Sequence, residues 1–391
     1  MFSPRLIALA LLASTVSAQT WTLSHDFAGE NFFNGFDFND NATDTTGSYG
    51  FIHFIGTSPA KDDLAYIRQG RAIIKVDNTT VGNPLDDRFG RNTILLESKD
   101  RISINSLLMF DAFHIPYGCS VWSGLWTLGS DWPREGEIDI IEGVNRVTKN
   151  QYALHNEPGL CKQPGNGDQQ SGSTTYEDCS ADKDNRGCSV LDPSTNSYGS
   201  GFASSQGGLY AMLWDETGIK LWFFERSRIP AGTDKNPDPS SWPKPSAFYP
   251  ATTCDPKTAF GPQKIRLYTN ICGAWAGNDG VWKETCGDVA PVCADVVRNP
   301  RTYDNAYWDI NYLRIFTSTG SPASEPTIQT STGLRPTSTL GSPTGAAAAS
   351  NSTGPSTNGN NAGLSGREAG HLSYIMGGML LSSSVVFVLG I

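Results

Sequence analysis

Three carboxylates, Glu137, Asp139 and Glu142, fall within six residues of the stretch Trp132–Glu142. The residues between them are isoleucines, whose β-branched side chains favour a half-buried strand. Because side chains alternate between the two faces of a strand, Glu137 and Asp139 share one face while the isoleucines beside them face a core. Strict alternation would put Ile141 on the carboxylate face in place of Glu142. We therefore predict a β-bulge, in which one extra residue returns Glu142 to the side of the other acids.

Acids crowded on one face suit nucleophilic and acid–base chemistry. Like charges in close reach raise the pKa of at least one member, which keeps one carboxylic acid protonated beside an ionised neighbour. Retaining glycosidases use such a pair, with carboxyl groups about 5–5.5 Å apart. Positions four steps apart on a strand that rises about 3.3 Å per residue are roughly 13 Å apart, so the strand must curve and the side chains must lean together. On spacing alone, a solvated acidic face or a calcium site is an equal alternative.

The first 18 residues have the features of a secretory signal. Arg5 precedes an apolar run over residues 6–12, and Val16-Ser-Ala18 fits a cleavage site, so we expect the mature chain to start at Gln19. The eight cysteines all follow this segment, and their even number fits pairing in an oxidising compartment.

Spacing decides little about how the cysteines pair, because eight cysteines allow 105 connectivities. The shortest candidate loops join Cys179 to Cys188 and Cys286 to Cys293. No C-x-x-C or paired-histidine spacing indicates zinc, so zinc is not expected from the sequence and no residue is assigned as a metal ligand. N-x-Ser/Thr sequons predict surface glycosylation sites at Asn41, Asn78 and Asn351.

The C-terminal part of the chain changes character. Residues 318–361 are dominated by Ser, Thr, Gly, Pro, Ala and Asn, which is typical of an O-glycosylated stalk that cannot bury a core. Small residues at 361–363, a polar spacer and an apolar tail ending at Ile391 fit a GPI-attachment signal. We expect lipid attachment near Asn361 and removal of residues 362–391; a C-terminal transmembrane helix is the alternative.

Residues 19–317 remain for the main domain, roughly 300 residues, a usual length for an all-β sandwich or barrel. Short β-branched and aromatic runs bounded by turn residues predict antiparallel strands, and Asp215-Glu-Thr-Gly218 predicts a hairpin turn. We expect two sheets packed face to face in a jelly-roll sandwich. The predicted strands are 51–55, 72–76, 93–96, 106–110, 209–214, 219–224 and 305–316.

Aromatic residues surround the acidic stretch. Trp122 and Trp126 have the even spacing that places them on one strand face, Trp132 opens the acidic stretch, and Trp275 follows Cys272-Gly-Ala. A tryptophan in a strand more often packs in a core, but flat indoles also suit the apolar faces of sugar rings. His155 lies thirteen residues beyond Glu142 and is either structural, a steering group for the acid, or a sugar contact.

The ordered set of motifs resembles glycoside hydrolase family 16, and within it the fungal laminarinase-like endo-1,3(4)-β-glucanases. The resemblance covers residues 19–317 and rests first on Gly136-Glu-Ile-Asp-Ile-Ile-Glu142 with Trp132-Pro133 and Trp122-x-x-x-Trp126. Further matching segments are Gly90-Arg91-Asn92, Asp111-x-x-His-Ile-Pro116, Leu154-His155, Tyr198-Gly-x-Gly-Phe202, Trp222-Phe-Phe, Cys272-Gly-x-Trp275 and Tyr307-Trp-Asp-Ile-Asn311.

The resemblance implies a β-jelly roll of the concanavalin A-like lectin and glucanase type, with a concave cleft for β-glucan. It implies Glu137 as nucleophile, Glu142 as acid/base and Asp139 as the carboxylate that tunes them. Trp122, Trp126, Trp132, His155, Trp275 and Arg91 are then expected to contact substrate. Where the family usually has Trp-Pro-Ala-Phe-Trp, this chain has Trp122-Ser-Gly-Leu-Trp126, and Asn156 and Leu160 also depart from the pattern, which bears on substrate preference.

The sequence leaves two rival functions open. A transglycosylase would use the same site with a sugar hydroxyl as acceptor, although such wall enzymes of the family usually carry the shorter E-x-D-x-E form. A non-catalytic glucan-binding wall protein would need none of the three acids in this register. No cofactor is expected beyond a structural calcium ion that the family leaves open. The net charge of −10 argues against nucleic acid as a partner, and we expect a secreted, surface-anchored monomer that acts on β-glucan.

Overall fold

The structure is a computed structural model that describes residues 20–41, 47–86, 89–182 and 185–318. All of these residues belong to one unit of the chain, Met1–Glu325. The predicted signal (1–18), the stalk beyond Ser318, the GPI propeptide (362–391) and the candidate sites Asn351 and Asn361 lie outside the described residues. Among the residues that are described, no helix is both long enough and apolar enough to span a bilayer.

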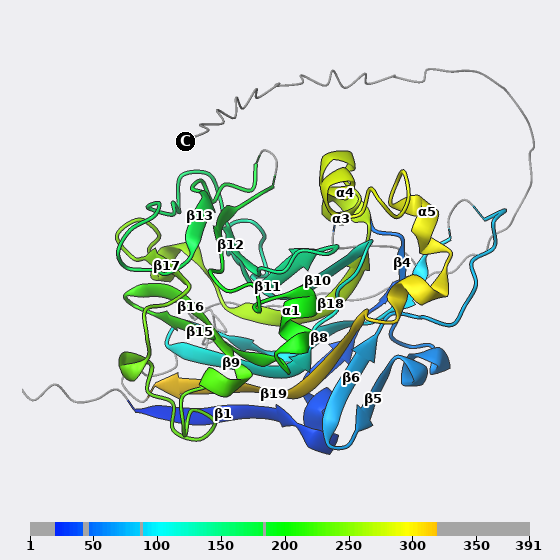
Figure 1. Cartoon of the computed structure of the whole chain (residues 1–391). Coiled ribbons are helices and arrows are strands. Elements are labelled where there is room, and N and C mark those ends of the chain that lie inside the picture. The colour runs from blue at the N-terminus through cyan, green and yellow to red at the C-terminus, as the bar shows by residue number, and fades with distance from the viewer. Residues whose placement is uncertain (1–19, 42–46, 87–88, 183–184, 319–391) are drawn as a thin grey trace, which may run out of the picture. The chain divides into compact units, whose positions relative to one another are not determined.

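Two large antiparallel sheets form the domain and are stacked as layers (Figure 1). This confirms the predicted all-β sandwich of the jelly-roll type. The sheet that carries the acidic stretch, which we call the acidic sheet, has the order β13-β14-β12-β11-β10-β18-β8-β2. Its strands are β2 (Phe36–Phe38), β8 (Leu95–Ile102), β10 (Val121–Leu128), β11 (Glu137–Val144), β12 (Gln151–His155), β13 (Ser173–Tyr176), β14 (Cys188–Leu191) and β18 (Gln263–Ile271).

The second large sheet, the supporting sheet, has the order β17-β16-β15-β9-β19-β6-β5, with β1 also paired to β19. Its strands are β1 (Trp21–Ala28), β5 (Ala65–Arg68), β6 (Arg71–Lys75), β9 (Ser106–His114), β15 (Gly208–Asp215), β16 (Gly218–Glu225), β17 (Ala247–Pro250) and β19 (Tyr307–Ser318). A small third sheet joins β3 (Asp40–Asn41), β4 (Ile52–Ile55) and β7 (Arg91–Thr93).

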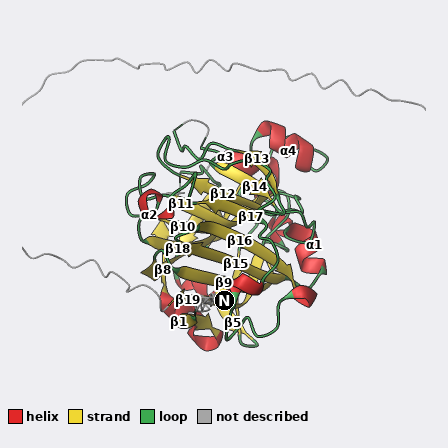
Figure 2. Cartoon of the chain, turned by 90° about the vertical axis from the view of Figure 1, so that its left-hand side faces the viewer, coloured by secondary structure: helices red, strands yellow, loops and turns green. Residues whose placement is uncertain are grey.

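Helices are short and lie around the periphery of the strands (Figure 2). The α-helices are α1 (Gly199–Ser204), α2 (Pro256–Ala259), α3 (Gly273–Ala276), α4 (Asp279–Thr285) and α5 (Ala294–Val297). The 3₁₀ helices are η1 (Gly29–Gly35), η2 (Pro59–Asp63), η3 (Arg226–Arg228), η4 (Pro239–Ser241) and η5 (Pro300–Tyr303).

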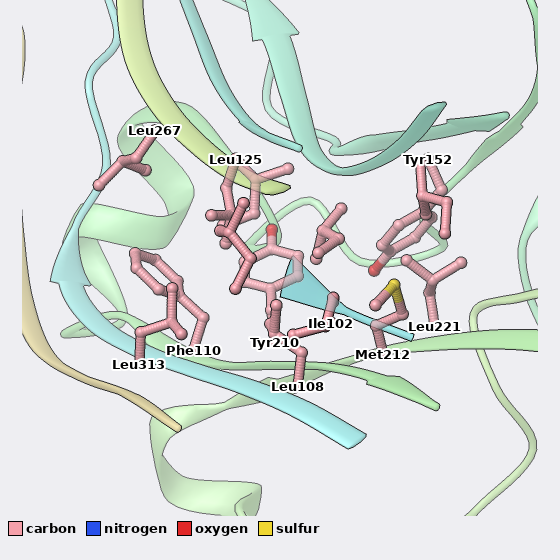
Figure 3. Close-up of a cluster of buried hydrophobic side chains, with 14 of the residues drawn as sticks. Ile102, Leu108, Phe110, Leu125, Tyr152, Tyr210, Met212, Leu221, Leu267 and Leu313 are labelled. Carbon is pink, nitrogen blue, oxygen red and sulfur yellow. The ribbon is translucent and has the colours of Figure 1, made fainter. Parts of the chain in front are cut away.

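The main core fills the space between the two large sheets. Leu125 and Leu267 from the acidic sheet face Phe110, Tyr210 and other side chains from the supporting sheet (Figure 3). The isoleucines of the acidic stretch belong to this core and are fully buried. Burying their apolar surface fixes which face of β11 points inward, since a slip of one residue would expose them all.

Most of the predicted strands occur near their predicted positions. The hairpin is confirmed, because β15 ends at Asp215 and β16 begins at Gly218. The single strand predicted for 93–96 is wrong: the chain leaves β7 after Thr93 and enters β8 at Leu95, so the two halves pair in different sheets. A short apolar run carries no signal for such a change of partner.

All eight cysteines form disulfides within the described residues. Cys179–Cys188 is confirmed, whereas the predicted Cys286–Cys293 loop is wrong. The pairs found are Cys119–Cys286, Cys161–Cys254, Cys179–Cys188 and Cys272–Cys293. The first and last of these tie the helical segment α3–α5, which contains Trp275, to the start of β10, which carries Trp122, and to the end of β18.

Candidate active site

The predicted β-bulge is present in β11. Across β10, Leu128 lies opposite Glu137, Trp126 opposite Asp139, and Gly124 opposite Glu142. The partners are evenly spaced on β10, so all three carboxylates share one face of the acidic sheet. The register shifts between Asp139 and Ile141, and Ile140 is the extra residue. The acids therefore lie on the face that points away from the core, which we call the outer face.

Two tryptophans hold the two glutamates. The indole Nε1 of Trp122 donates to Oε1 of Glu142 at 3.1 Å. The side chain of Trp132 hydrogen-bonds Glu137 and favours its ionised form. Trp132 is 40% exposed and Trp122 is half-buried, so each indole binds a carboxylate and still presents ring surface to solvent. The structure therefore places both predicted residues beside the acids.

His155 and Asp139 form the buried centre of the site. His155 lies opposite Glu137 across the β11–β12 pair, and its Nε2 is 3.2 Å from Oδ2 of Asp139. Its other ring nitrogen, Nδ1, is 3.1 Å from Oδ1 of Asn185. Both side chains of the His155–Asp139 pair are less than a tenth exposed. The histidine thus supplies the cation that faces the three acids.

The surroundings shift the pKa values of the two glutamates upward. Burial raises the pKa of Glu137 to about 7, the charge of Asp139 adds to this, and His155 and Trp132 oppose it. Burial likewise raises the pKa of Glu142 to about 8, with Asp139 adding and His155 and Trp122 opposing. The two groups interact, so they titrate as a pair, with the higher value on Glu142.

The histidine is held in its charged form. Burial by itself lowers the pKa of His155, but Glu137, Asp139 and Glu142 outweigh burial and raise the pKa to about 10. Donor atoms of Glu137, Asp139 and His155 lie within 4.8 Å of one another, a spacing that could hold a metal ion. A protonated imidazole is no metal ligand, so an ion could bind here only if His155 lost its proton; with the proton in place, the imidazolium provides the positive charge that faces the acids. The calcium ion that the family resemblance leaves open stays a prediction.

Two more of the predicted aromatic residues lie on the same side of the sheet. Trp275 in α3 is half-buried and packs edge-on against Trp122, with ring centroids 5.7 Å apart. Trp126 shares the strand face of Trp122, but only 8% of it is exposed, and its ring packs against Tyr268 and the guanidinium of Arg266. Trp275 therefore has surface to offer a sugar, whereas Trp126 mainly supports the sheet.

The prediction that Arg91 contacts substrate is wrong. Its side chain has no exposed surface and donates to the carbonyl oxygens of Val297, at 2.7 Å, and Thr80. The guanidinium also lies 5.0 Å from the ring centroids of Phe89 and Tyr303. Arg91 ties three chain segments together and reaches no solvent.

The sequence reasoning missed two polar residues of the site. Asn185 holds His155 from a loop thirty residues away, and nothing local to it signals that contact. Arg266 lies opposite Trp126 on β18, a strand that was not predicted, although Lys264 and Arg266 alternate there with Ile265 and Leu267. That alternation was the available signal. Of the glycosylation candidates, Asn78 is half-buried with its amide donating to Asp304, and Asn41 ends β3; both stay predictions.

A family model described as "XgeA-like, catalytic GH16 domain" matches residues 36–316, which include the whole acidic stretch. The chain belongs to glycoside hydrolase family 16. The family 16 domain thus holds β2 through nearly all of β19, and the site above lies in its acidic sheet.

Curated fungal relatives agree with this assignment. A probable glycosidase of Schizosaccharomyces pombe is 37% identical over 305 residues, which are 76% of this chain and 70% of that protein. An endo-1,3(4)-β-glucanase of Arthroderma benhamiae is 36% identical over 328 residues, 81% of this chain and 69% of that protein. The protein is accordingly a glycoside hydrolase of family 16.

Solved structures resemble the family 16 domain over its whole length. Laminarinase 16A from Phanerochaete chrysosporium, with β-glucans in donor and acceptor sites, is 32% identical with a TM-score of 0.69. An elongating family 16 β-1,3-glucosyltransferase is 36% identical with a TM-score of 0.69. Each match covers 76% of this chain and all of the solved chain.

Proposed function

We propose that the protein is an endo-β-glucanase that cleaves β-1,3-glucan, and mixed β-1,3/1,4-glucan, with retention of configuration. The observation that supports this most is the bulge, because it puts Glu137, Asp139 and Glu142 on one face with a tryptophan donor on each glutamate. The names of the relatives support the glucan class, since one is an endo-1,3(4)-β-glucanase and another a laminarinase with bound β-glucans.

In this proposal the two glutamates divide the chemistry. Glu137 has the lower of the two raised pKa values and is the nucleophile: its carboxylate attacks the anomeric carbon and forms a glycosyl-enzyme. Glu142 has the higher pKa and is the general acid that protonates the departing glycosidic oxygen. Glu142 then acts as a base, removing a proton from the water that releases the sugar with its original configuration.

Asp139 and His155 govern the charge between the two glutamates. The Asp139 carboxylate raises the pKa of both, which keeps Glu142 protonated at neutral pH, while the imidazolium prevents the three acids from standing together uncompensated. Their ion pair also holds the centre of the site rigid, because both side chains are buried.

The test is the stereochemistry and linkage of the products. Digestion of laminarin followed at once by proton NMR should show the β-anomer first, and an initial α-anomer would refute the proposed pair of roles. A panel of defined β-1,3, mixed-linkage and β-1,4 glucans, with the cleaved bonds mapped by mass spectrometry, should show cleavage of the first two. Cleavage of β-1,4-glucan alone would contradict the proposed substrate.

Transfer to a sugar acceptor is the second candidate. The solved β-1,3-glucosyltransferase is 36% identical and is described as elongating. Two departures from the family pattern lie close to the acids in this chain: Gly124 is opposite Glu142, and Asn156 follows His155, which is opposite Glu137. Both reactions share the glycosyl-enzyme and differ in whether water or a sugar hydroxyl resolves it. Size analysis of products from an end-labelled laminari-oligosaccharide separates them, because products longer than the substrate require transfer.

We further propose export and attachment to the cell surface through a GPI lipid. The cysteines, all paired within the described residues, support an oxidising compartment. The signal segment 1–18 and the tail 362–391 supply the sequence argument. Treatment of intact cells with a phosphatidylinositol-specific phospholipase should release the enzyme, whereas a transmembrane anchor would keep it on the cells.

A further inference from the structure

The side chain of Asn150 spans the bulge in β11. Asn150 comes directly before β12 and is fully buried. Its Nδ2 donates to the carbonyl oxygen of Ile140 at 3.0 Å, and its Oδ1 accepts from the backbone N–H of Glu142 at 3.0 Å. One amide thus contacts the extra residue of the bulge and the acid that the bulge reorients.

These two backbone groups lie where the strand ladder is interrupted. On the β12 side, Asp139 pairs with Ala153 and the next pair is Glu142 with Gln151, so the register shifts across Ile140 and Ile141. A buried backbone donor or acceptor without a partner costs about 1–3 kcal/mol. An asparagine amide offers one donor group and one acceptor at fixed spacing, which matches the two groups at the bulge.

Asn150 is itself anchored from the other side. Its backbone N–H donates to Oγ of Ser197 at 2.9 Å, and its carbonyl accepts from the N–H of Asp192 at 2.9 Å. The amide therefore reaches the bulge from a position fixed by neighbouring segments. Through its hydrogen bond to the Glu142 N–H, the Asn150 side chain restrains Glu142 relative to the rest of the sheet.

We propose that Asn150 is the positioning residue for the general acid: it holds the bulge open and so keeps the carboxyl of Glu142 on the outer face beside Trp122. This rests on the proposed role of Glu142. Without the amide, β11 can relax toward regular pairing, and a slip of one residue turns Glu142 toward the core. The consequence falls on proton donation, since Glu137 and Asp139 precede the bulge.

The test compares substrates that need an acid with substrates that do not. Asn150→Ala should lower kcat/KM on laminarin by about 10–100-fold, less than the roughly 10²–10⁴-fold expected for loss of the acid itself, because the acid is displaced and not removed. It should leave the burst of dinitrophenol from 2,4-dinitrophenyl β-laminaribioside within about threefold of wild type, because that leaving group departs without a proton. Equal losses on both substrates would overturn the proposal.

Gln163→Ala is the matched control. Gln163 is also a fully buried amide, and it donates to Gln170 and to the carbonyl of Phe248 at 3.0 Å each, away from the acidic stretch. It should lower thermal stability as Asn150→Ala does, yet show no difference between the two substrates. A substrate difference in Gln163→Ala would mean that any loss of a buried amide produces it.

Asn150→Asp covers the case in which the alanine variant does not fold, and it tests the hydrogen bonds directly. A protonated aspartic acid restores both bonds, with O–H to the Ile140 carbonyl and C=O to the Glu142 N–H. An ionised one loses the donor. The ratio of laminarin activity in the Asp variant to that in wild type should therefore rise as pH falls. A ratio that does not change with pH would contradict the proposed positioning role of the Asn150 amide. Glu137, Glu142 and His155 titrate in both proteins, and the charge of Asp139 acts on them in both, so their contribution cancels in the ratio.

Failure of the inference and failure of the proposed function are distinguishable. If Glu142→Gln itself shows no loss specific to laminarin, Glu142 is not the acid and the proposed function fails. If Glu142→Gln shows that loss and Asn150→Ala does not, only the positioning role is wrong.

Discussion

Two groups of charged side chains lie on the outer face of the acidic sheet, and they are built in opposite ways. In the first, Glu97 on β8 meets two cations of β18: Lys264 at 2.9 Å and Arg266 at 2.6 Å. In the second, the three carboxylates of β11 share His155. The groups are neighbours, because Trp126 lies opposite Asp139 on one side and opposite Arg266 on the other.

Their pKa shifts differ in sign although both groups are partly buried. Burial pushes the pKa of Glu97 upward, but the hydrogen bonds from Lys264 and Arg266 outweigh burial and lower the pKa. Glu137 and Glu142 rise instead to about 7 and about 8. Burial alone therefore does not make an acid reactive. The balance between burial, which raises the pKa in both groups, and the neighbouring acids and cations decides whether a carboxyl group on this face is a fixed charge or a proton donor.

Replacing each glutamate by glutamine should give the largest difference in activity between the two groups. Glu137→Gln and Glu142→Gln should each lower kcat on laminarin by about 10²–10⁴-fold or more, because the proposed nucleophile or the proposed general acid is lost. Glu97→Gln should stay within about threefold of wild type, since Glu97 is not one of the reacting groups. Steady-state rates with reducing-sugar detection suffice. Turnover close to wild type in either of the first two variants contradicts the assignment, provided that circular dichroism shows intact folds.

Asp139→Asn removes one acid from the group on β11 and leaves Glu137 and Glu142, the two proposed reacting groups, in place. The charge of Asp139 raises the pKa of both Glu137 and Glu142, so its loss should lower both values. The proposed roles require Glu137 to be ionised and Glu142 to be protonated, so wild type should be most active between about pH 7 and pH 8. The bell-shaped profile of the variant should move to lower pH, with kcat reduced about 10–100-fold at neutral pH.

Asp111→Asn is the matched control for that shift. Asp111 is equally buried but lies on β9 of the supporting sheet, where its Oδ2 accepts from Arg226 at 2.6 Å. Its pH–rate profile should coincide with that of wild type. An unmoved profile in Asp139→Asn would mean that the charge balance on the outer face does not set the two pKa values.

The contrast also marks what could be predicted from sequence. The bulge could be predicted, because the spacing of the core-facing isoleucines and the spacing of the carboxylates cannot both fit a regular strand without one extra residue. The family resemblance supplied the roles of the acids. Both signals are local, or ordered along the chain, and neither requires knowledge of which strands become neighbours.

What could not be predicted depends on pairing between distant segments. Arg91 matched a family motif, yet its burial against Val297 and Tyr303 follows from contacts more than two hundred residues away. The long-range disulfides have the same origin, because a cysteine carries no mark of its partner. The cations of β18 escaped notice for a related reason: their importance comes from lying beside Glu97 and Trp126.

The two tryptophan donors give a smaller and more specific effect. Each indole hydrogen bond favours the ionised form of its glutamate, Trp122 for Glu142 and Trp132 for Glu137. Trp122→Phe should therefore raise the pKa of Glu142 and move the alkaline limb of the profile upward. Trp132→Phe should raise the pKa of Glu137 and move the acidic limb upward. Each shift should be under about one pH unit, with kcat changed a few-fold, as expected for one hydrogen bond to a charged group.

The pair of variants sharpens the assignment of roles, because each one predicts the limb that moves. Full pH–rate profiles on a soluble laminari-oligosaccharide are the measurement. If Trp122→Phe moves the acidic limb and Trp132→Phe moves the alkaline limb, the roles are reversed, with Glu142 as nucleophile and Glu137 as general acid. Ring packing is largely kept by phenylalanine in both, so a general loss of substrate affinity appears in KM and not in the limbs.

The smallest expected effect is on the free energy of unfolding, and the direction in which it changes with pH differs between the two groups. The pKa of Glu97 is lowered in the folded protein, so its contribution to stability is present above the unfolded pKa of about 4.3 and is lost as pH falls through the folded value. Glu97→Gln should therefore cost about 1–2 kcal/mol of unfolding free energy at pH 7, and this difference from wild type should shrink in acid. Urea unfolding at several pH values measures it.

His155 should show the reverse dependence. Its folded pKa is raised to about 10 from an ordinary value near 6.5, so its contribution is complete below about pH 6.5 and is lost as pH rises toward 10. Asp139→Asn removes one of the charges that raise this pKa, so its stability should depend less on pH on the alkaline side. If the difference in unfolding free energy from wild type changes with pH in opposite directions in Glu97→Gln and Asp139→Asn, the group around Glu97 stabilises the sheet by charge pairing and the group around His155 does not. A change in the same direction in both variants would contradict this contrast.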